Sequence, residues 1–279
     1  MVRKCLTVII FLCSTLTLKC QSIFSIIHLN EETQIHKGIP QSITESKVFY
    51  NSNGTENKRE FTEFDQLGLP ISRTFFDENQ NVTSIVSYKY DTVKRRILES
   101  KILEVNTRFH TRKAQTVYYY DSSICPVKVQ YLSLDGEILT EVLLKNNSFG
   151  LPIELQLYEP QGNLIGIEIA SHLLEENKTI VSVANRKGEI ISTDTIKTNF
   201  KNAYKFNDPN IKYNDKGDVI FSQSKWFDGS IHFKEYDYVY DLSGNWIEEK
   251  AFEVIYKSNG KKKRELKSHF KRDILYWTK

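Results

Sequence analysis

Three tyrosines just ahead of a turn are the residues of this sequence best suited to contact a ligand. Tyr236, Tyr238 and Tyr240 recur at every second position, and Trp226 and Trp246 stand on either side of them. Side chains two residues apart in a strand point to the same face, so these rings can share one surface. Aromatic rings stack on sugars, and Tyr and Trp keep a polar atom for hydroxyl groups. The competing interpretation is a cross-strand ladder that stabilises a sheet, and the pattern favours it.

Acidic residues are frequent around the same turn, as in Asp237, Asp241 and the pair Glu248–Glu249. Two carboxylates catalyse glycoside hydrolysis only when the fold holds them a fixed distance apart across a cleft. An Asp oxygen also accepts a hydrogen bond from the backbone amide two residues on, which opens a turn. We therefore interpret the Asp residues as turn caps, and we expect at least one of the two glutamates to face water.

Histidine and cysteine spacing gives no support to a metal or nucleophilic centre. None of the six histidines stands within metal-ligand spacing of another histidine or of Cys125. The chain has no G-x-S-x-G motif, no phosphate-binding loop and no dinucleotide fingerprint. Cys125 precedes Pro126 at an expected strand start, and we interpret it as a small buried apolar residue. The sequence therefore predicts no catalytic residue, no metal and no cofactor; the protein is not expected to be an enzyme.

The N-terminus has the pattern of an export signal. Arg3 and Lys4 precede an apolar run, Cys5–Leu18, which is shorter than the ~20 residues of a membrane-spanning helix. Small residues at Cys20 and Ser22 favour cleavage after Ser22. The pattern predicts a secreted or periplasmic protein, or one at the cell surface.

Two alternatives to that cleavage stay open. Cys20 could be the lipid-modified cysteine of an outer-membrane lipoprotein, although Lys19 stands where such signals normally carry a small residue. The signal could also remain uncleaved as an anchor. Contact with a membrane is expected only in these two cases.

Composition favours strands and excludes a dedicated nucleic-acid-binding protein. The chain has 15 Tyr and 16 Phe against 12 Gly and 6 Pro, and its formal net charge is +3. Basic residues cluster only in Lys261–Arg264, which we interpret as a solvated hairpin loop. A nucleic acid would need a broader basic face.

A degenerate repeat organises most of the chain. Acidic or Asn residues open turns at intervals of 26, 30, 26, 67 and 27 residues, namely Asp65, Asp91, Asp121, Asn147, Asn214 and Asp241. The long interval has room for two weaker units, at Glu176–Asn177 and Tyr204–Asn207. Glycine often follows three residues after the opener, and proline often starts the next alternating stretch. Each unit therefore predicts two strands and two turns of an antiparallel sheet with one apolar face.

These patterns predict an all-β fold: a curved antiparallel meander forming an open shell, a partial barrel or a bent sheet. We expect a signal peptide at residues 1–22 and one β-repeat domain at 23–279. Within that domain, 23–46 is an irregular lead-in with Ile26–Leu29 as a candidate strand, and 47–279 is the repeat sheet. The apolar face must be hidden by curling, by folding over, or by a ligand or partner.

The turns framed by aromatic residues, Tyr88–Asp91 and Tyr238–Trp246, resemble the YD repeats of the bacterial Rhs family. The resemblance runs from about Phe61 to the C-terminus. It covers the repeat array only, so neither encapsulation nor toxicity is expected, and it supplies no catalytic residues. It implies an exported binding module of the envelope or exterior, with glycans or envelope components as partners.

The sequence thus predicts an exported, non-enzymatic binding or structural protein of unknown ligand, with glycans as one candidate class. The aromatic residues Trp226, Tyr236, Tyr238, Tyr240 and Trp246 form its candidate ligand-binding platform. The alternative is a carrier that holds a lipid or another apolar ligand in the concave face of the curved sheet.

Overall fold

The computed structural model describes residues 22–27, 35, 37–91, 97–107, 110–198, 210–225, 229–256 and 261–278. Apart from a short helix, α1 (Ile23–Ile27), and a single 3-10 turn, η1 (Leu174–Glu176), the elements are seventeen strands. The predicted all-β fold is confirmed. The strands are β1 (Pro40–Asn51), β2 (Gly54–Phe64), β3 (Pro70–Phe76), β4 (Val82–Tyr90), β5 (Leu98–Asn106), β6 (Thr111–Tyr120), β7 (Pro126–Leu132), β8 (Ile138–Asn146), β9 (Pro152–Tyr158), β10 (Leu164–Leu173), β11 (Lys178–Asn185), β12 (Ile190–Lys197), β13 (Ile211–Tyr213), β14 (Val219–Lys225), β15 (Ile231–Tyr240), β16 (Trp246–Tyr256) and β17 (Lys262–Tyr276).

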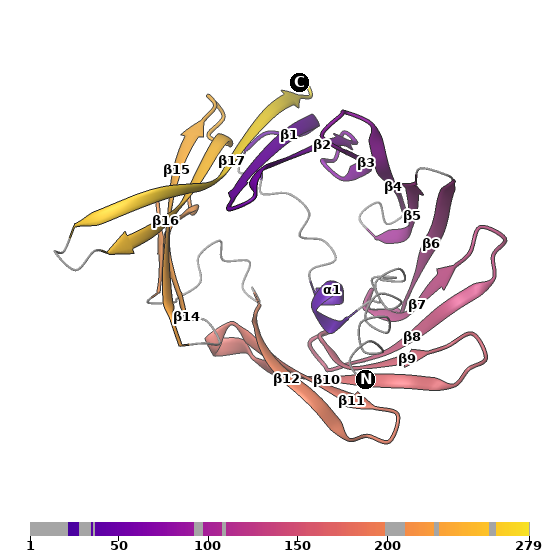
Figure 1. Ribbon diagram of the computed structural model, residues 1–279. Coiled ribbons are helices and arrows are strands. Elements are labelled where there is room, and N and C mark those ends of the chain that lie inside the picture. Colours follow the sequence, from indigo (N-terminus) through magenta and orange to yellow (C-terminus); the bar gives the residue numbers. More distant parts are fainter. Residues whose placement is uncertain are drawn as a thin grey trace, which may run out of the picture.

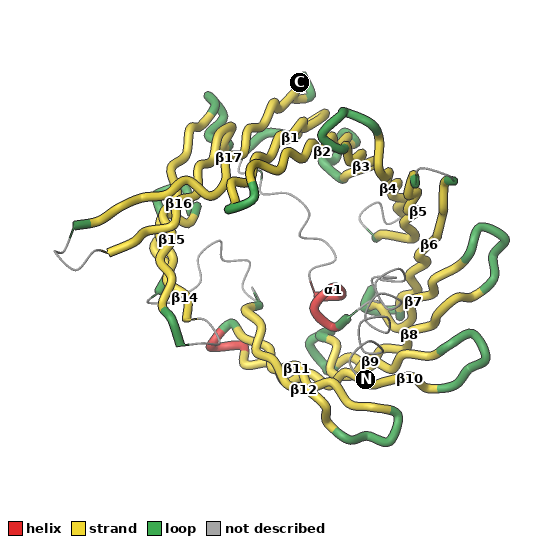
Figure 2. The backbone as a smooth tube through the Cα atoms, in the orientation of Figure 1, coloured by secondary structure: helices red, strands yellow, loops and turns green. Residues whose placement is uncertain are grey.

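The strands form one antiparallel sheet that curls until its first and last strands meet (Figure 1). Each strand pairs with the next from β1 to β12 and from β13 to β17, and β1 also pairs with β17. The described residues of β12 and β13 show no such register, so the sheet is open there. Figure 2 shows the resulting curved meander of strands and short turns.

The pairing of β1 with β17 brings together residues from the two ends of the chain. Its register runs from Pro40 opposite Tyr276 to Phe49 opposite Ser268. Just beyond β17, the Trp277 indole N–H donates to the backbone oxygen of Asp65 at 3.1 Å. The C-terminal segment therefore joins β1 to the strands at the other end of the described chain.

The repeated turns hold themselves in place through their first side chain. In the turn after β2, the backbone N–H groups of Leu67 and Leu69 donate to Asp65 Oδ1 at 2.8 and 2.9 Å. Gly68 adopts φ +79°, a conformation that favours glycine. The same two side-chain contacts recur at Asp77, Asp121, Asn147, Asn185 and Asn214. The interpretation of the Asp residues as turn caps is confirmed at these positions, but it is wrong for Asp237, which lies within β15 and contacts Arg264 at 2.8 Å.

The repeat spacing does not predict one of these turns, and one predicted unit lies outside the described residues. Asn185 opens an Asn-x-x-Gly turn with the same contacts as its relatives, so its sequence signal was present. The predicted unit at Glu176–Asn177 is a turn, in which the Asn177 N–H donates to the Leu174 oxygen. The unit at Tyr204–Asn207 lies outside the described residues.

Two local expectations are wrong. Ile26 and Ile27 belong to α1 and not to a strand, and β1 begins at Pro40 inside the segment expected to be irregular. The basic run at Lys262–Arg264 lies in β17 and not in a loop. In both strands long-range pairing decides the outcome: Arg264, for example, contacts Asp237 of β15 at 2.8 Å.

The two faces of the sheet can be followed through its register, because directly paired residues point to the same side. Val129 of β7 pairs with Tyr118 and with Val142, and all three are buried. They form one core with Ile23 and Ile26 of α1, which are 0% and 5% exposed. Figure 1 shows α1 on the inner side of the curve, so the apolar residues of β5–β10 lie on the concave face.

The concave face changes character away from α1. Following the pairs from Lys101 and Tyr88 through β3 and β2 leads to Glu60 opposite Glu45, and then to Arg272. On β1–β3 and β15–β17 the concave face is therefore charged and aromatic. The predicted single apolar face is apolar over only part of the sheet.

We expect Asp65→Ala to lower the free energy of unfolding by about 1–2 kcal/mol, because two backbone N–H groups lose their acceptor. Asp65→Asn keeps an oxygen in the same place, as Asn147 does naturally, and should remain within about 0.5 kcal/mol of wild type. Urea denaturation of the three proteins checks this. Equal destabilisation by both substitutions would show that charge, and not the turn contact, matters at this position.

Candidate functional site

A line of charged side chains crosses the concave face where the first strand, β1, pairs with the last strand, β17. We call it the concave polar strip, and it consists of Arg73 of β3, Glu60 of β2, Glu45 and Lys47 of β1, Arg272 of β17 and Glu249 of β16. Register places all of them on the face that carries the core under α1.

Cations and anions alternate along the strip and contact one another. Arg73 Nε donates to Glu60 Oε1 at 2.6 Å, and Lys47 Nζ lies 3.3 Å from Glu60 Oε2 and 2.7 Å from Glu45 Oε1. Arg272 Nε donates to Glu45 Oε2. These five side chains are between 12% and 28% exposed, so water screens the pairs only in part.

The pKa values of two carboxylates of the strip are shifted in opposite directions. Burial disfavours the ionised form of Glu45, but Arg272 and Lys47 outweigh burial and hold the pKa of Glu45 below its ordinary value. Burial raises the pKa of Glu249, and the hydrogen bond from Tyr238 and the charge of Arg272 offset this only in part. The anion at Glu45 is therefore required by its neighbours, whereas the anion at Glu249 is disfavoured.

Three of the aromatic residues singled out in the sequence lie together beside the strip. The ring centroids of Tyr238 and Tyr240 are 6.0 Å apart, and those of Tyr238 and Trp246 are 6.4 Å apart. Trp246 is 4% exposed, and the guanidinium carbon of Arg272 lies 3.3 Å from its ring centroid. Tyr236 shares the concave face of β15, and Trp226 lies outside the described residues.

The hydroxyl groups of this cluster are bonded inside the protein. Tyr240 donates to Asp218 Oδ2 at 2.6 Å, and Tyr238 donates to the backbone oxygen of Val219 at 3.1 Å. Burial raises the pKa of both tyrosines, which keeps both hydroxyl groups protonated. This geometry favours the ladder interpretation for Tyr238, Tyr240 and Trp246. A ligand role for the platform stays a prediction.

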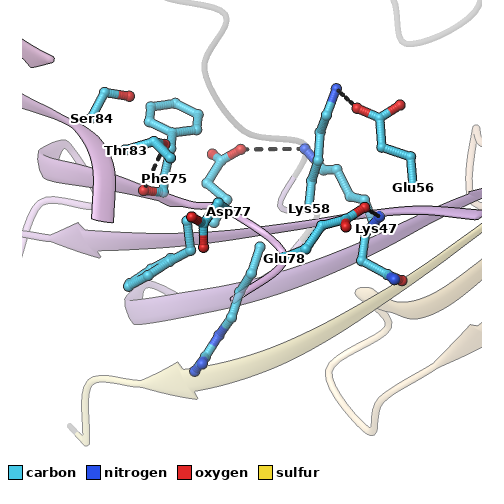
Figure 3. A pocket seen from close by; sticks show the side chains of 12 residues that line it. Lys47, Glu56, Lys58, Phe75, Asp77, Glu78, Thr83 and Ser84 are labelled. Atoms are coloured by element: carbon cyan, nitrogen blue, oxygen red, sulfur yellow. Dashed lines mark hydrogen bonds and ion pairs between the residues drawn. The ribbon is translucent and has the colours of Figure 1, made fainter. Parts of the chain in front are cut away.

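A hollow of about 610 Å³ opens on the concave face next to the strip (Figure 3). Its walls come from β1 to β4 and the turn that follows β3. Figure 3 shows Phe75 with Thr83 and Ser84 on one side of it, and Lys58 with Glu56 on the other. The lining residues are Lys47, Glu56, Asn57, Lys58, Arg59, Glu60, Phe75, Phe76, Asp77, Glu78, Thr83 and Ser84.

Charged groups of both signs line the hollow, three cationic and four acidic. Lys58 Nζ contacts Glu56 Oε1 at 2.9 Å, and Arg59 donates to Gln80 Oε1 at 2.8 Å. Hydrogen-bond donors and acceptors thus stand close together in the hollow that the Phe75 side chain also lines. The sequence carried one signal for this region: Arg73 interrupts the apolar alternation that its repeat partners keep.

The acidic pair Glu248–Glu249 cannot act on one substrate. Adjacent residues of a strand point to opposite faces, and Glu249 faces the concave side. Glu248 contacts Lys250 at 2.9 Å and His269 at 2.7 Å on the convex side. This agrees with the expectation that at least one carboxylate turns outward.

Cys125 is half-buried in the turn between β6 and β7. Burial and the nearby charge of Asp121 raise the pKa of its thiol, which keeps the sulfur protonated and unreactive. Its Sγ lies where a Cβ at Gly150 would stand only 2.6 Å away, so the sulfur packs closely against the neighbouring turn. This position suits a small packing residue.

Within the described ranges, no group of three or more His, Cys, Asp or Glu side chains could hold a metal ion. The helices described here include none that is long and apolar enough to cross a membrane.

No family model matches the sequence, and no curated protein matches it. Among solved structures, the chain is similar to a porin-like protein from Bacteroides uniformis ATCC 8492, at 9% identity and a TM-score of 0.44, covering 85% of this chain and 98% of that one. It is also similar to TcdB2-TccC3, at 12% identity and a TM-score of 0.26, covering 76% of this chain but 15% of that one. Both TM-scores are too low for either likeness to bear on function.

Substitution of the two strip carboxylates should give opposite results. At pH 7, Glu45→Gln removes the carboxylate that contacts Arg272, and one of the two that contact Lys47, and should lower the free energy of unfolding by about 2–4 kcal/mol. Glu249→Gln keeps an oxygen for the Tyr238 hydroxyl and removes a disfavoured charge, so its stability should equal or exceed that of wild type.

The pH dependence has a defined sign. The pKa of Glu45 is depressed, so its contribution is full above the ordinary value of 4.5 and is lost as pH falls through the folded value. The pKa of Glu249 is raised, so its cost appears as pH rises past 4.5. Urea denaturation at pH 7 and at successively lower pH should show the two variants converging as Glu45 becomes protonated in the folded state. Variants that stay equally far apart throughout would contradict this assignment.

Proposed function

We propose that this protein is an exported, non-enzymatic β-repeat protein of the bacterial envelope or exterior that binds a glycan in the hollow on the concave face of β1–β4. One observation carries the proposal. In that hollow, Phe75 shares the lining with acidic and basic side chains that offer closely spaced hydrogen-bond donors and acceptors.

The chemistry of the hollow fits a sugar better than a charged ligand. Its charged groups are paired with other groups of the protein, as in the contacts of Lys58 with Glu56 and of Lys47 with Glu60. A charged ligand would have to break such pairs. A hydroxyl group both donates and accepts, so it can join a pair without separating it. The Phe75 ring offers an apolar surface for the C–H face of the sugar.

The turn chemistry supports the finer assignment to YD-type repeats. The Asp/Asn-x-x-Gly turns on which the resemblance rests are self-capped and join successive strands of one meander. Export is supported by the basic and apolar N-terminal pattern, with cleavage after Ser22 and the lipoprotein route through Cys20 as its alternative. Envelope components are then the partners within reach.

The carrier alternative has a specific obstacle. The apolar half of the concave face is the part a lipid would occupy, and Ile23 and Ile26 of α1 are already buried against it. A carried lipid would have to displace that helix. Native mass spectrometry of the freshly purified protein tests this: co-purified lipid would favour the carrier over the glycan binder.

The glycan proposal is tested with an array of neutral and acidic oligosaccharides, followed by calorimetry with the best-bound neutral glycan. Phe75→Ala should weaken binding about 10-fold, since it removes the stacking surface. Tyr119→Ala removes an aromatic ring from the convex face and should bind like wild type. Circular dichroism first establishes that both variants are folded. The proposal is wrong if no glycan binds, or if Tyr119→Ala weakens binding and Phe75→Ala does not.

A further inference from the structure

An unusual contact fixes α1 to the sheet. The backbone nitrogen of Ile23 donates to Glu168 Oε2 of β10 at 2.8 Å. Ile23 is 0% exposed and is part of the core under the concave face, together with Leu155 and Ala170. A backbone N–H at the first residue of a helix has no acceptor within the helix. Here the Glu168 carboxylate is the acceptor.

The surroundings of Glu168 are poor for a lone negative charge. Its neighbours across the sheet are Leu155 of β9 and Val183 of β11. Burial raises the pKa of Glu168, and the hydrogen bond from Ile23 offsets this only in part. An ionised carboxylate in an apolar setting is costly unless it is paired with a cation.

Within the described residues of β9–β12, two other titratable groups face the same side as Glu168. His172 is on β10, and its ring nitrogens contact Thr179 Oγ1 and the Pro152 backbone oxygen, each at 2.9 Å. Asp194 is on β12, where it pairs with Val181 and is exposed. Neither contributes to the shift in the pKa of Glu168, which burial raises and the Ile23 hydrogen bond lowers only in part.

The nitrogen that contacts Glu168 is the one that export processing would release. The peptide bond between Ser22 and Ile23 is the bond that the signal pattern predicts to be cut. A signal peptidase would hydrolyse it with one water molecule. The C–N bond breaks, the oxygen of the water joins the Ser22 carbonyl carbon, and the Ile23 nitrogen becomes an amine that takes up a proton at neutral pH.

We propose that removal of the export signal turns the Ile23 amide into the α-amino group of the mature chain, and that this ammonium forms a partly buried ion pair with Glu168 that holds α1 on the concave face. The inference rests on the proposed export and adds a role for the cut itself. It identifies Glu168 as the residue that receives the new N-terminus.

Cleavage after Ser22 also removes hydrogen bonds at the start of α1, and the ion pair would replace them. In the unprocessed chain, Ser22 caps α1, since the Ser25 N–H donates to Ser22 Oγ at 3.2 Å and the Ile26 N–H to Ser22 O at 3.0 Å. Both contacts leave with Ser22. A charge-assisted bond is stronger than a neutral one, so the ammonium replaces them at the same end of the helix.

The test compares two N-termini in the presence and absence of the carboxylate. One chain begins at Ile23, released from a fusion cut directly before it, and the other retains Gln21 and Ser22. Glu168→Gln should lower the folded-to-unfolded ratio about 10-fold or more in the chain that begins at Ile23, and less than about 3-fold in the longer chain. Urea denaturation at pH 7 measures both effects.

A matched control comes from the neighbouring strand. Glu154 of β9 pairs with Lys145 at 3.0 Å and faces the convex side. Glu154→Gln removes an equal charge, and its effect should not depend on the N-terminus. An effect of Glu168→Gln that is equal in both chains would overturn the proposal, because it would mean that the amide alone serves Glu168.

Two further measurements complete the test. An α-amino group gaining an anionic partner has a raised pKa, so the extra stability should be full below its ordinary value of about 8 and lost as pH rises through the folded value. Intact mass of the exported protein should match a start at Ile23; a start at Cys20 with acyl groups, or an uncut chain, would overturn the proposal. Glycan binding is measured separately, so its failure leaves these outcomes intact.

Discussion

The pairing of β1 with β17 is the constraint on which the rest of the structure depends. A meander of hairpins has free edges, and only the meeting of the first and last strands turns this one into a continuous curved surface. The contact of Glu45 with Arg272 spans that junction and joins residues 227 positions apart. Bringing such distant segments together has an entropic cost that hairpin turns do not have, and nine residue pairs with a half-buried ion pair offset it.

Local chemistry was predictable from the sequence because it is decided within a few residues. The turns at Asp65 and Asn147 are predicted by a glycine three residues further on. Pro70 and Pro152 begin strands as expected. The site was not predictable in the same way. The concave polar strip and the hollow form only after β1, β2 and β17 meet, and no local pattern specifies that meeting. Ile26 shows the same limit: a short apolar run suits a strand or a helix, and burial against β9 and its neighbours selects the helix.

The concave face divides two tasks between two kinds of surface. Over β6–β10 it is apolar, and the protein covers it with its own N-terminal helix. Over β1–β4 and β15–β17 it is polar, but its charges are paired so that few act alone. A surface of this second kind stays wet without strongly attracting ions. The tyrosine and tryptophan cluster packs against the strip, as the stacking of Arg272 on Trp246 shows.

The order of chain synthesis gives the clasp between β1 and β17 one further consequence. β1 is made well before its second partner, β17, so while the strands between them are synthesised one edge of β1 has no neighbour. A chain that stops short of residue 262 retains its self-capped hairpins but exposes that edge, together with Glu45 deprived of Arg272. Open strand edges recruit other chains. Copies that lack β17 are therefore the ones most exposed to aggregation and to proteases.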